Sequence, residues 1–243
     1  MKLKTSKLGW AIGDEDSHIG KWVEDSGKLA HDEFLIPLAC SHIKAGACVI
    51  DCGANVGSHT IAYSSKVGKE GTVIAVEPGK VAFECLLHNV GRFPINNVMP
   101  IKAALSDQDG MTVEHSESLN LGASTCSPIE KQAQIPGNSY LLTVTLDFIA
   151  SQIQLPISFI KLDIEGWETD ALIGASHILR DHKPTLLIEV NRGALENQGS
   201  SIKDLLAVLH QNKYVWKICQ PNCSLTDDQF DILARPLASQ PAQ

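Results

Sequence analysis

The sequence lacks the features that would indicate a membrane protein, a secreted protein or a nucleic-acid-binding surface. No apolar run approaches the ~20 residues that a membrane-spanning helix needs. The basic residues 1–7 lead into no hydrophobic segment of the kind that follows in a secretory signal. The net charge is −8, and lysine and arginine are nowhere clustered as non-specific nucleic-acid binding requires. We therefore expect a cytoplasmic protein with no membrane and no nucleic-acid partner.

The sequence is also poor in cysteine patterns that hold metals. Its seven cysteines are scattered, without a CxxC pair or a Cys/His cluster of zinc spacing. Thiols arranged in this way are expected to stay reduced in the cytosol. We therefore expect no metal site, although the carboxylates described below would permit a divalent cation.

What is present is the composition and pattern of one large α/β domain, with 44% apolar and 20% charged residues. After residue 46 strand and helix patterns alternate, which predicts a mostly parallel sheet with helices on both faces. A Gln-Pro-Asn turn at 220–222 joins the last two strands, so we expect them to pair antiparallel at one edge. Strands are expected at 48–51, 72–76, 98–103, 157–163, 185–190, 214–219 and 230–235, and helices at 58–67, 79–90, 167–180 and 201–212.

The first 44 residues differ from the rest. A helix is expected over 31–43, ending at Gly46, so residues 1–44 are predicted to be an N-terminal helical segment. Residues 45–243 then form the cofactor-binding domain, within a single compact unit.

Two irregular segments, 9–30 and 116–139, interrupt the regular pattern, and such segments in compact domains often form lids or binding loops. We expect them to flank the mouth of a cofactor cleft, where Trp10 and Trp22 would supply an apolar contact surface. The alternative is that both tryptophans only pack the N-terminal segment onto the helices.

The most informative stretch is Val-Ile-Asp-Cys-Gly-Ala-Asn-Val-Gly at residues 49–57. A strand pattern ends at Asp51, a turn runs from Gly53 to Gly57, and a helical pattern follows. Glycine lets the backbone turn sharply and approach a ligand, and a helix N-terminus offers free N–H groups. Glycine fingerprints of nucleotide sites also need an acid ~20 positions further on. Glu77 stands there, at the end of a strand, where it could hold two ribose hydroxyls.

This fingerprint departs from the dinucleotide pattern in one informative way. The middle glycine, which lets a pyrophosphate approach the backbone, is replaced by Asn55. A polar side chain there, with Asp51 at the strand end, suits a ligand that carries an amino acid and positive charge. S-adenosylmethionine (SAM) has that profile and is favoured over a dinucleotide and over a purely structural turn.

Ligands of open α/β sheets bind outside the carboxyl ends of the strands. Acidic residues gather at these predicted ends, although each could instead cap the next helix or belong to a turn. By contrast, His59 is expected to be packed or solvent-facing, and Lys161 to snorkel toward solvent or to pair with an acid. The acids at the strand ends are Asp51, Glu77, Asp107, Asp163, Glu165 and Glu189.

Several blocks together resemble the FkbM family of SAM-dependent methyltransferases. They occur in the family's order and cover about residues 45–215. The resemblance implies a Rossmann-like class I methyltransferase with a mostly parallel seven-stranded sheet of order 3-2-1-4-5-7-6, its last strand antiparallel. It also implies methyl transfer, usually to oxygen. The blocks are Asp51-Cys-Gly-Ala-Asn-Val-Gly-Ser-His-Thr60, Val76-Glu-Pro78, Ala104-Leu-Ser-Asp107 with Gly110, Leu146-Asp147, Ile160-Lys-Leu-Asp-Ile-Glu-Gly-Trp-Glu168 and Pro184-Thr-Leu-Leu-Ile-Glu-Val190.

The resemblance also implies roles for individual residues. The turn after the first strand would line the methionine end of SAM, and Glu77 would hold the ribose. Ser106 and Asp107 would meet the adenine, and Asp163 the cofactor's amino group or the reaction centre. The full implied cofactor-binding set is Asp51, Gly53, Asn55, Val56, Gly57, Thr60, Glu77, Pro78, Ser106, Asp107 and Asp163.

Methyl transfer from a sulfonium needs alignment of the nucleophile, and a hydroxyl nucleophile needs a proton acceptor. Asp163, Glu165 and Glu189 are the predicted catalytic acceptors, with His18 or His31 as alternatives if the N-terminal segment folds over the site. The acceptor is expected to be a small molecule or glycan. An inactive binding module and an NAD-dependent enzyme remain as alternatives. The oligomeric state stays open, with a homodimer as one option.

Overall fold

The fold is built around one seven-stranded sheet. In this computed structural model, the described residues are 4–7, 9–13, 21, 23, 25–26, 29, 32–93, 96–115, 125–128 and 139–237. The sheet order is β10-β11-β9-β8-β1-β2-β3, and β11 runs antiparallel to both its neighbours. Counted in chain order within this sheet, that is 3-2-1-4-5-7-6, as the resemblance implied. The strands are β1 (Cys48–Cys52), β2 (Thr72–Val76), β3 (Val98–Ile101), β8 (Ile157–Leu162), β9 (Thr185–Asn191), β10 (Tyr214–Ile218) and β11 (Gln229–Pro236).

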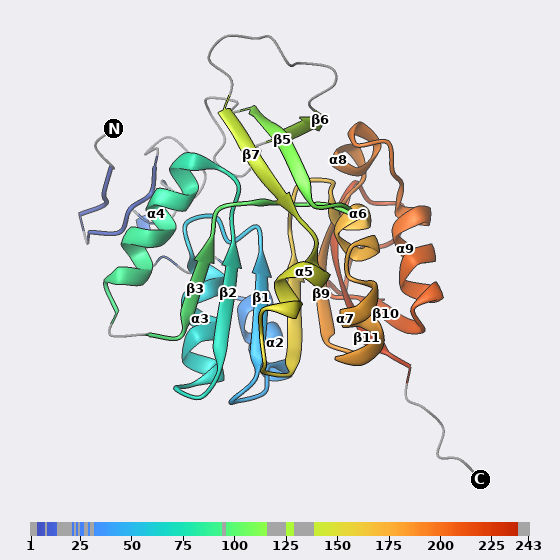
Figure 1. Cartoon of the computed structure of the whole chain (residues 1–243), viewed down its shortest axis with the longest axis horizontal. Helices are drawn as coiled ribbons and strands as arrows, with labels where there is room; N and C mark the ends of the chain where they lie inside the picture. The colour runs from blue at the N-terminus through green and yellow to red at the C-terminus, as the bar shows by residue number, and fades with distance from the viewer. Residues whose placement is uncertain are drawn as a thin grey trace.

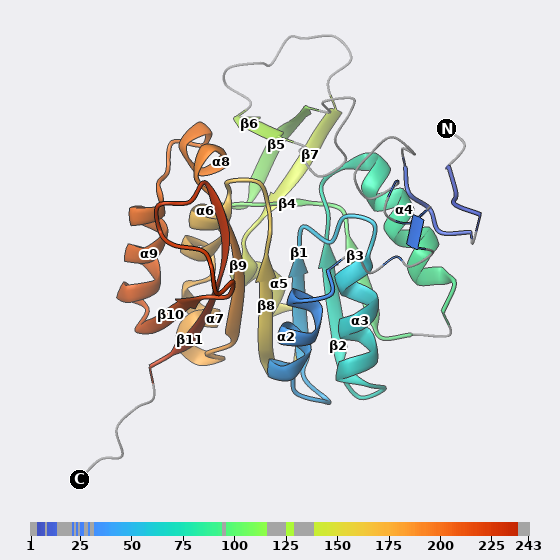
Figure 2. The same cartoon turned by 180° about the vertical axis from the view of Figure 1, so that it is seen from behind.

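Helices cover both faces of this sheet (Figures 1 and 2). Because side chains alternate along a strand, Val49 packs toward α2 and α3, whereas Ile50 packs toward α5, α6, α7 and α9. β1 is buried at every position, as expected of a central parallel strand covered on both faces. The helices are α2 (Leu35–His42), α3 (Ser58–Val67), α4 (Lys80–Gly91), α5 (Leu146–Ser151), α6 (Glu168–Ile173), α7 (Ser176–Asp181), α8 (Arg192–Asn197) and α9 (Ile202–Gln211).

Two of the predicted helices differ in the structure, and α8 was not predicted. α2 begins at Leu35, where the Asp32 carboxylate accepts the N–H groups of Phe34 and Leu35 and caps the helix. The single helix predicted over 167–180 is two helices, α6 and α7. The break lies at Gly174, whose α-carbon sits so close to the Ser106 carbonyl oxygen that a Cβ would overlap it.

A second, four-stranded sheet of order β4-β7-β5-β6 lies beyond the carboxyl ends of the large sheet, at the top of Figure 1. Short strand patterns at 111–115 and 140–145 of the sequence predict only its two longest strands. The described part of this sheet consists of β4 (Ala104–Leu105), β5 (Gly110–His115), β6 (Thr125–Pro128) and β7 (Ser139–Val144). Within the described residues, none of the helices has the length and apolar character to span a bilayer.

Strand register brings the acidic residues together. Asp51 of β1 pairs with Lys161 of β8, and Glu189 of β9 pairs with Asp231 of β11. Because β1, β8 and β9 are parallel, their carboxyl ends meet at one edge of the sheet. The acids predicted at these strand ends therefore share one region of the surface.

Candidate active site

The turn between β1 and α3 is held in a conformation that ordinary side chains rarely adopt. Gly53 has φ +75° and Asn55 has φ +49°. A Cβ on Gly53 would overlap the Asp163 carbonyl oxygen, so this turn and the end of β8 are in direct backbone contact. Glycine at position 53 is therefore required both by the backbone angle and by the space.

Glu77 fixes the other side of this turn. Its carboxylate accepts the backbone N–H of Asn55 at 2.8 Å and that of Gly79 at 2.8 Å. The side chain is buried, and burial raises its pKa to about 7, against the lowering effect of these two hydrogen bonds. Each oxygen accepts one N–H group and retains further acceptor capacity.

Lys161 lies at the centre of the site. Its Nζ lies 2.9 Å from Asp163 Oδ2 and 3.8 Å from Asp51 Oδ1, and it donates to the Gly53 carbonyl oxygen at 3.3 Å. Burial alone would lower the pKa of Lys161. Attraction by Asp163 and Asp51 and the hydrogen bond to Asp163 outweigh burial and raise this pKa. The lysine therefore stays charged inside the protein.

Asp51 is fully buried behind the turn. Its Oδ2 accepts a hydrogen bond from Thr60 Oγ1 at 2.6 Å, whereas Oδ1 has no hydrogen-bond donor among the described residues. Burial raises the pKa of Asp51, and Lys161 and the Thr60 hydrogen bond oppose that rise. Asp51 and Thr60 thus join β1 to α3 beneath the site.

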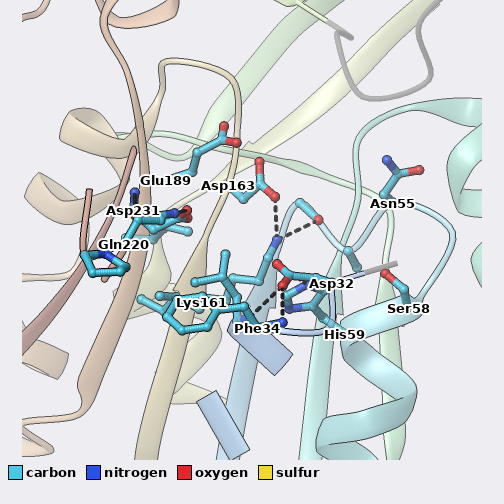
Figure 3. A pocket seen from close by; sticks show the side chains of 16 residues that line it. Asp32, Phe34, Asn55, Ser58, His59, Lys161, Asp163, Glu189, Gln220 and Asp231 are labelled. Atoms are coloured by element: carbon cyan, nitrogen blue, oxygen red, sulfur yellow. Dashed lines mark hydrogen bonds and ion pairs between the residues drawn. The ribbon is translucent and has the colours of Figure 1, made fainter. Parts of the chain in front are cut away.

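A cavity of about 520 Å³ opens in front of these residues. Figure 3 shows Glu189, Gln220 and Asp231 on one side, Asn55 and Ser58 on the other, and Lys161 and Asp163 between them. The cavity therefore extends from the glycine turn to the antiparallel edge of the sheet. Its lining is Asp32, Phe34, Leu35, Gly53, Ala54, Asn55, Ser58, His59, Lys161, Leu162, Asp163, Leu187, Glu189, Gln220, Pro221 and Asp231.

The far wall of the cavity is acidic. Glu189 accepts a hydrogen bond from the Gln229 amide at 2.7 Å, and Asp231 accepts one from the Gln220 amide. Burial, with repulsion from Asp163, raises the pKa of Glu189 to about 9. Burial also raises the pKa of Asp231 to about 6. These carboxyl groups can donate or accept hydrogen bonds, depending on the pH.

Glu165 lies beside the cavity but is not part of its lining. It has φ +54°, and burial, with repulsion from Asp163 and Glu168, raises its pKa to about 7. Glu168 braces this loop, because its Oε1 accepts the N–H groups of Ile164 at 2.9 Å and Gly166 at 3.3 Å. Glu165 can therefore influence the charge near Asp163 without touching the cavity.

Comparison with known proteins agrees with this arrangement. The family model described as "Methyltransferase FkbM domain" matches residues 51–216, more than half of the chain. The chain belongs to the FkbM methyltransferase family. The match spans the glycine turn, Glu77, the β8 end and β9, so the cofactor end of the cavity lies within the FkbM domain. Six residues of the lining lie outside the matched range: Asp32, Phe34, Leu35, Gln220, Pro221 and Asp231.

The fold comparison gives the same architecture. The structure resembles methyltransferase FkbM from Methylobacillus flagellatus, with a TM-score of 0.55 and 19% identity, covering 79% of this chain and 44% of that one. It also resembles a proposed rRNA methylase from Clostridium thermocellum, with a TM-score of 0.53 and 12% identity, covering 85% and 95%. At such identities the likeness concerns the fold alone.

One curated relative is more similar in sequence over a short stretch. It is described as a probable cobalt-precorrin-6B C(15)-methyltransferase (decarboxylating) of Sulfurisphaera tokodaii and is 37% identical over 68 residues. That stretch covers 28% of this chain and 35% of the relative. The match thus spans less than half of both the Methylobacillus and the Sulfurisphaera proteins. The substrates of those proteins are therefore not assigned to this chain.

The structure places the implied cofactor residues of this FkbM domain in different surroundings. Gly53, Asn55 and Asp163 line the cavity. Val56 packs with Cys85 in a separate apolar cluster, and a Cβ on Gly57 would press against Leu86. Val56 and Gly57 therefore pack the turn against α4 and do not line the cavity. They join Asp51 and Thr60, which are buried beneath the cavity.

Ser106 and Asp107 lie away from the cavity, after β4. The Ser106 hydroxyl donates to Asp107 Oδ1 at 3.1 Å, and both residues belong to the connection toward the second sheet. Their assignment to adenine, and that of Pro78 to the ribose side, stays a prediction.

Only some of the N-terminal residues named in the sequence analysis lie among the described residues. Trp10 stacks on Phe93, with ring centroids 5.7 Å apart, and Arg92 lies over its ring. It therefore packs at the end of α4 and is not part of the cavity lining. Trp22, His18, His31 and most of the 9–30 and 116–139 segments lie outside the described residues.

Sequence reasoning missed several residues of the cavity, chiefly His59 and Asp32. The His59 Nδ1 atom is hydrogen-bonded to the Tyr63 hydroxyl at 2.9 Å, and the His59 Nε2 atom lies 3.9 Å from Asp32 Oδ2. His59 is the second residue of α3, and this position next to the glycine turn was the one sequence feature that could have placed it at the site. No sequence feature places Asp32 or Asp231 at the cavity, because the residues they meet there are remote in sequence. Among described residues, no group of three or more His, Cys, Asp or Glu side chains could hold a metal ion.

Proposed function

We propose that this chain transfers the methyl group of SAM to a hydroxyl oxygen of a small molecule, sugar or glycan. The observation that carries the proposal is the single cavity that joins the glycine turn and Asp163 to an acidic wall formed by Glu189 and Asp231. One end of this cavity suits the cofactor's amino acid, and the other leaves room for an acceptor.

The residues present fit SAM. Within the part of the chain that the structure describes, the Asn55 side-chain oxygen is buried and has no hydrogen-bond donor, and Asp163 is 38% exposed at the cavity. Both can accept from the cofactor's ammonium group, and the absence of a Cβ at Gly53 brings the backbone to the ligand. Glu77 has acceptor capacity for ribose hydroxyls. The remaining assignments are Asp51, Val56, Gly57 and Thr60 as support for the turn, Pro78 beside the ribose, and Ser106 and Asp107 at the adenine.

SAM supplies a methyl group that is already activated by its sulfonium. The protein has to hold the acceptor hydroxyl in line, exclude water and accept a proton. We assign proton acceptance to Asp163, which lines the cavity next to the cofactor end. Glu189, with its raised pKa of about 9, is protonated at neutral pH and can donate a hydrogen bond to the acceptor. Glu165 acts through the charge it places near Asp163.

His59 is a second candidate for the proton acceptor, because its ring lines the cavity. Its Nε2 faces the Asp32 carboxylate at 3.9 Å, a neighbour that would stabilise the imidazolium formed when the ring takes a proton. Both residues line the same cavity as Asp163. A loss of transfer in His59→Gln with cofactor binding unchanged would assign the proton to His59 rather than Asp163.

The charge of the cavity limits the acceptor. Four carboxyl groups line it (Asp32, Asp163, Glu189 and Asp231), and its one lysine is already paired with Asp163. Glu189 is protonated at neutral pH, so three carboxylates remain. Phosphate or carboxylate groups near Asp32 and Asp231, away from the cofactor end, would be repelled, so the acceptor is a neutral or positively charged hydroxyl compound. A diphosphate cofactor would meet the same repulsion, which argues against an NAD-dependent enzyme.

The test is transfer of labelled methyl from SAM to three sets of acceptors: neutral sugars and polyols, carboxylic acids, and RNA. We expect label only in the hydroxyl compounds, and its loss in Asp163→Asn. Asp228→Asn, at an almost fully exposed position, is the matched control. Label confined to RNA or to carboxylic acids would overturn the assignment of the acceptor.

A further inference from the structure

Lys161 occupies a place where a charged residue is costly. It lies within β8, between the neighbouring strand positions Asp51 and Leu187, and its side chain is 7% exposed. Moving an ammonium group out of water carries a penalty that is repaid only by close, well-placed partners. A leucine or methionine would pack this position without that penalty, as Leu187 does next to it. The lysine therefore has to be explained by what its charge contacts.

Its contacts join the two strand ends that form the cofactor end of the cavity. The ammonium group donates to the Gly53 carbonyl at 3.3 Å, and so holds the glycine turn after β1. It also pairs with Asp163 Oδ2 at 2.9 Å, and so directs the carboxylate after β8 (Figure 3). The backbones of Gly53 and Asp163 already touch. Lys161 therefore fixes the one side chain at this junction that is free to rotate.

The same ammonium group balances charge. Asp51 and Asp163 lie on either side of it, and without it the two carboxylates would repel each other in a buried setting. Asp51 is otherwise held only by the Thr60 hydroxyl. Loss of the lysine would therefore free Asp163 to turn toward solvent and would leave Asp51 without a counter-ion.

We propose that Lys161 is a positioning residue for the cofactor: it holds the Asp163 carboxylate and the Gly53 carbonyl in the arrangement that receives the ammonium end of SAM. The inference rests on the proposed function, since it assumes that SAM binds at this junction. It acts through Asp163 and the turn, and not through contact with the transferred methyl group.

The experiment is a double-mutant cycle on the affinity for S-adenosylhomocysteine, measured by calorimetry, with Lys161→Met, Asp163→Asn and the double variant. Because the charge-assisted bond acts through Asp163, we expect Lys161→Met to weaken binding about tenfold or more. The double variant should lose less affinity than the product of the two single losses, because the part of the lysine's effect that passes through Asp163 is already lost in Asp163→Asn. Lys161→Arg, which keeps the charge, should recover part of the loss. Lys217→Met, at an exposed position on β10, is the matched control.

The outcomes separate this inference from the proposed function. If the wild-type protein fails to bind S-adenosylhomocysteine, the proposed function falls, and this inference falls with it. If the wild type binds but the two single losses multiply in the double variant, Lys161 does not act through Asp163 and only the inference is overturned. An unchanged affinity in a folded Lys161→Met variant has the same meaning. Should Lys161→Met not fold, Lys161→Gln, which removes the charge but keeps a polar side chain, takes its place in the cycle, and the same comparison decides.

Discussion

At the scale of single residues, the site depends on three residues that each contact the backbone of another segment. Glu77 accepts the N–H groups of Asn55, within the glycine turn, and of Gly79, just before α4. Gly53 allows the turn to touch the end of β8. Lys161 donates to the same turn from the other side. The cofactor end of the cavity is therefore shaped by three residues from three adjacent strand ends.

We predict that Glu77→Ala weakens binding of S-adenosylhomocysteine about ten- to a hundredfold, because a hydrogen bond to a charged group contributes roughly 1.5–3 kcal/mol. Titration calorimetry of both proteins measures the change. Glu70→Ala, an exposed glutamate between α3 and β2, is the control. Another exposed acid, Asp109, would be a poor control because its carboxylate accepts the Thr145 N–H at 2.7 Å, so its loss would also disturb the backbone. An unchanged dissociation constant would show that Glu77 only braces the backbone.

Gly53→Ala should abolish binding of S-adenosylhomocysteine and lower the melting temperature, because the new Cβ would overlap the Asp163 carbonyl oxygen. Gly68→Ala is the matched control: Gly68 has φ +72° but open space around it. With φ +72° and ψ −170°, it should show only the cost of a side chain in a backbone region that glycine alone adopts readily, roughly 1–3 kcal/mol. Equal losses in the two variants would mean that the contact with Asp163 is unimportant.

At the scale of elements, the sequence predicted what periodicity and turn chemistry encode. All seven strands of the main sheet and α3, α4 and α9 were expected where they occur. The break between α6 and α7 was not, because it depends on contact between Gly174 and the remote Ser106. β4 was missed because it has two residues and pairs with the remote β7. β6 was missed because it lies within the segment 116–139, which the sequence analysis treats as irregular, although it pairs with the preceding strand β5.

The same limit applies to the site. Asp163 and Glu189 were predicted, because acids after apolar strands follow a general rule of α/β sheets. Asp32 and Gln220 were not, because they reach the cavity through tertiary packing of α2 and of the connection before β11. For Lys161 the sequence left snorkelling and pairing with an acid open, and the structure shows a pair with Asp163.

One interaction between elements can be tested directly. Asp147, in the first turn of α5, accepts the N–H groups of His177 and Ile178 at 2.9 Å each and caps α7. Asp147→Ala should lower the free energy of unfolding by about 0.5–2 kcal/mol, the usual effect of losing a cap. Denaturant unfolding measures it, and the affinity for S-adenosylhomocysteine should not change. Asp181→Ala, an exposed acid of the same helix, should have almost no effect, so equal losses would contradict the capping role.

At the scale of the whole molecule, the site makes stability depend on pH. Burial raises the pKa of Glu77 and Glu165 to about 7, of Asp231 to about 6 and of Glu189 to about 9. The folded protein therefore holds more protons than the unfolded chain above about pH 5. Because stability falls with pH wherever the folded state binds more protons, these groups stabilise the protein at mildly acidic pH.

We predict that the melting temperature falls as the pH rises from about 5 to about 9. Glu189→Gln should flatten the upper part of this decline, between about pH 7 and about pH 9, because Glu189 has the most strongly raised pKa of the four. Scanning calorimetry of both proteins across this range provides the measurement. Glu196→Gln, an acid of α8 outside the cavity, should leave the curve unchanged. A curve that rises with pH in the wild type would contradict the account.

The central claim is that the cavity between the glycine turn and the acidic wall binds SAM. Calorimetric titration with S-adenosylhomocysteine and, separately, with NAD tests it most directly. The account predicts micromolar binding of S-adenosylhomocysteine, on the order of −8 kcal/mol, and no measurable binding of NAD. Binding of NAD, or no heat and no thermal shift with S-adenosylhomocysteine at millimolar concentration, would contradict it.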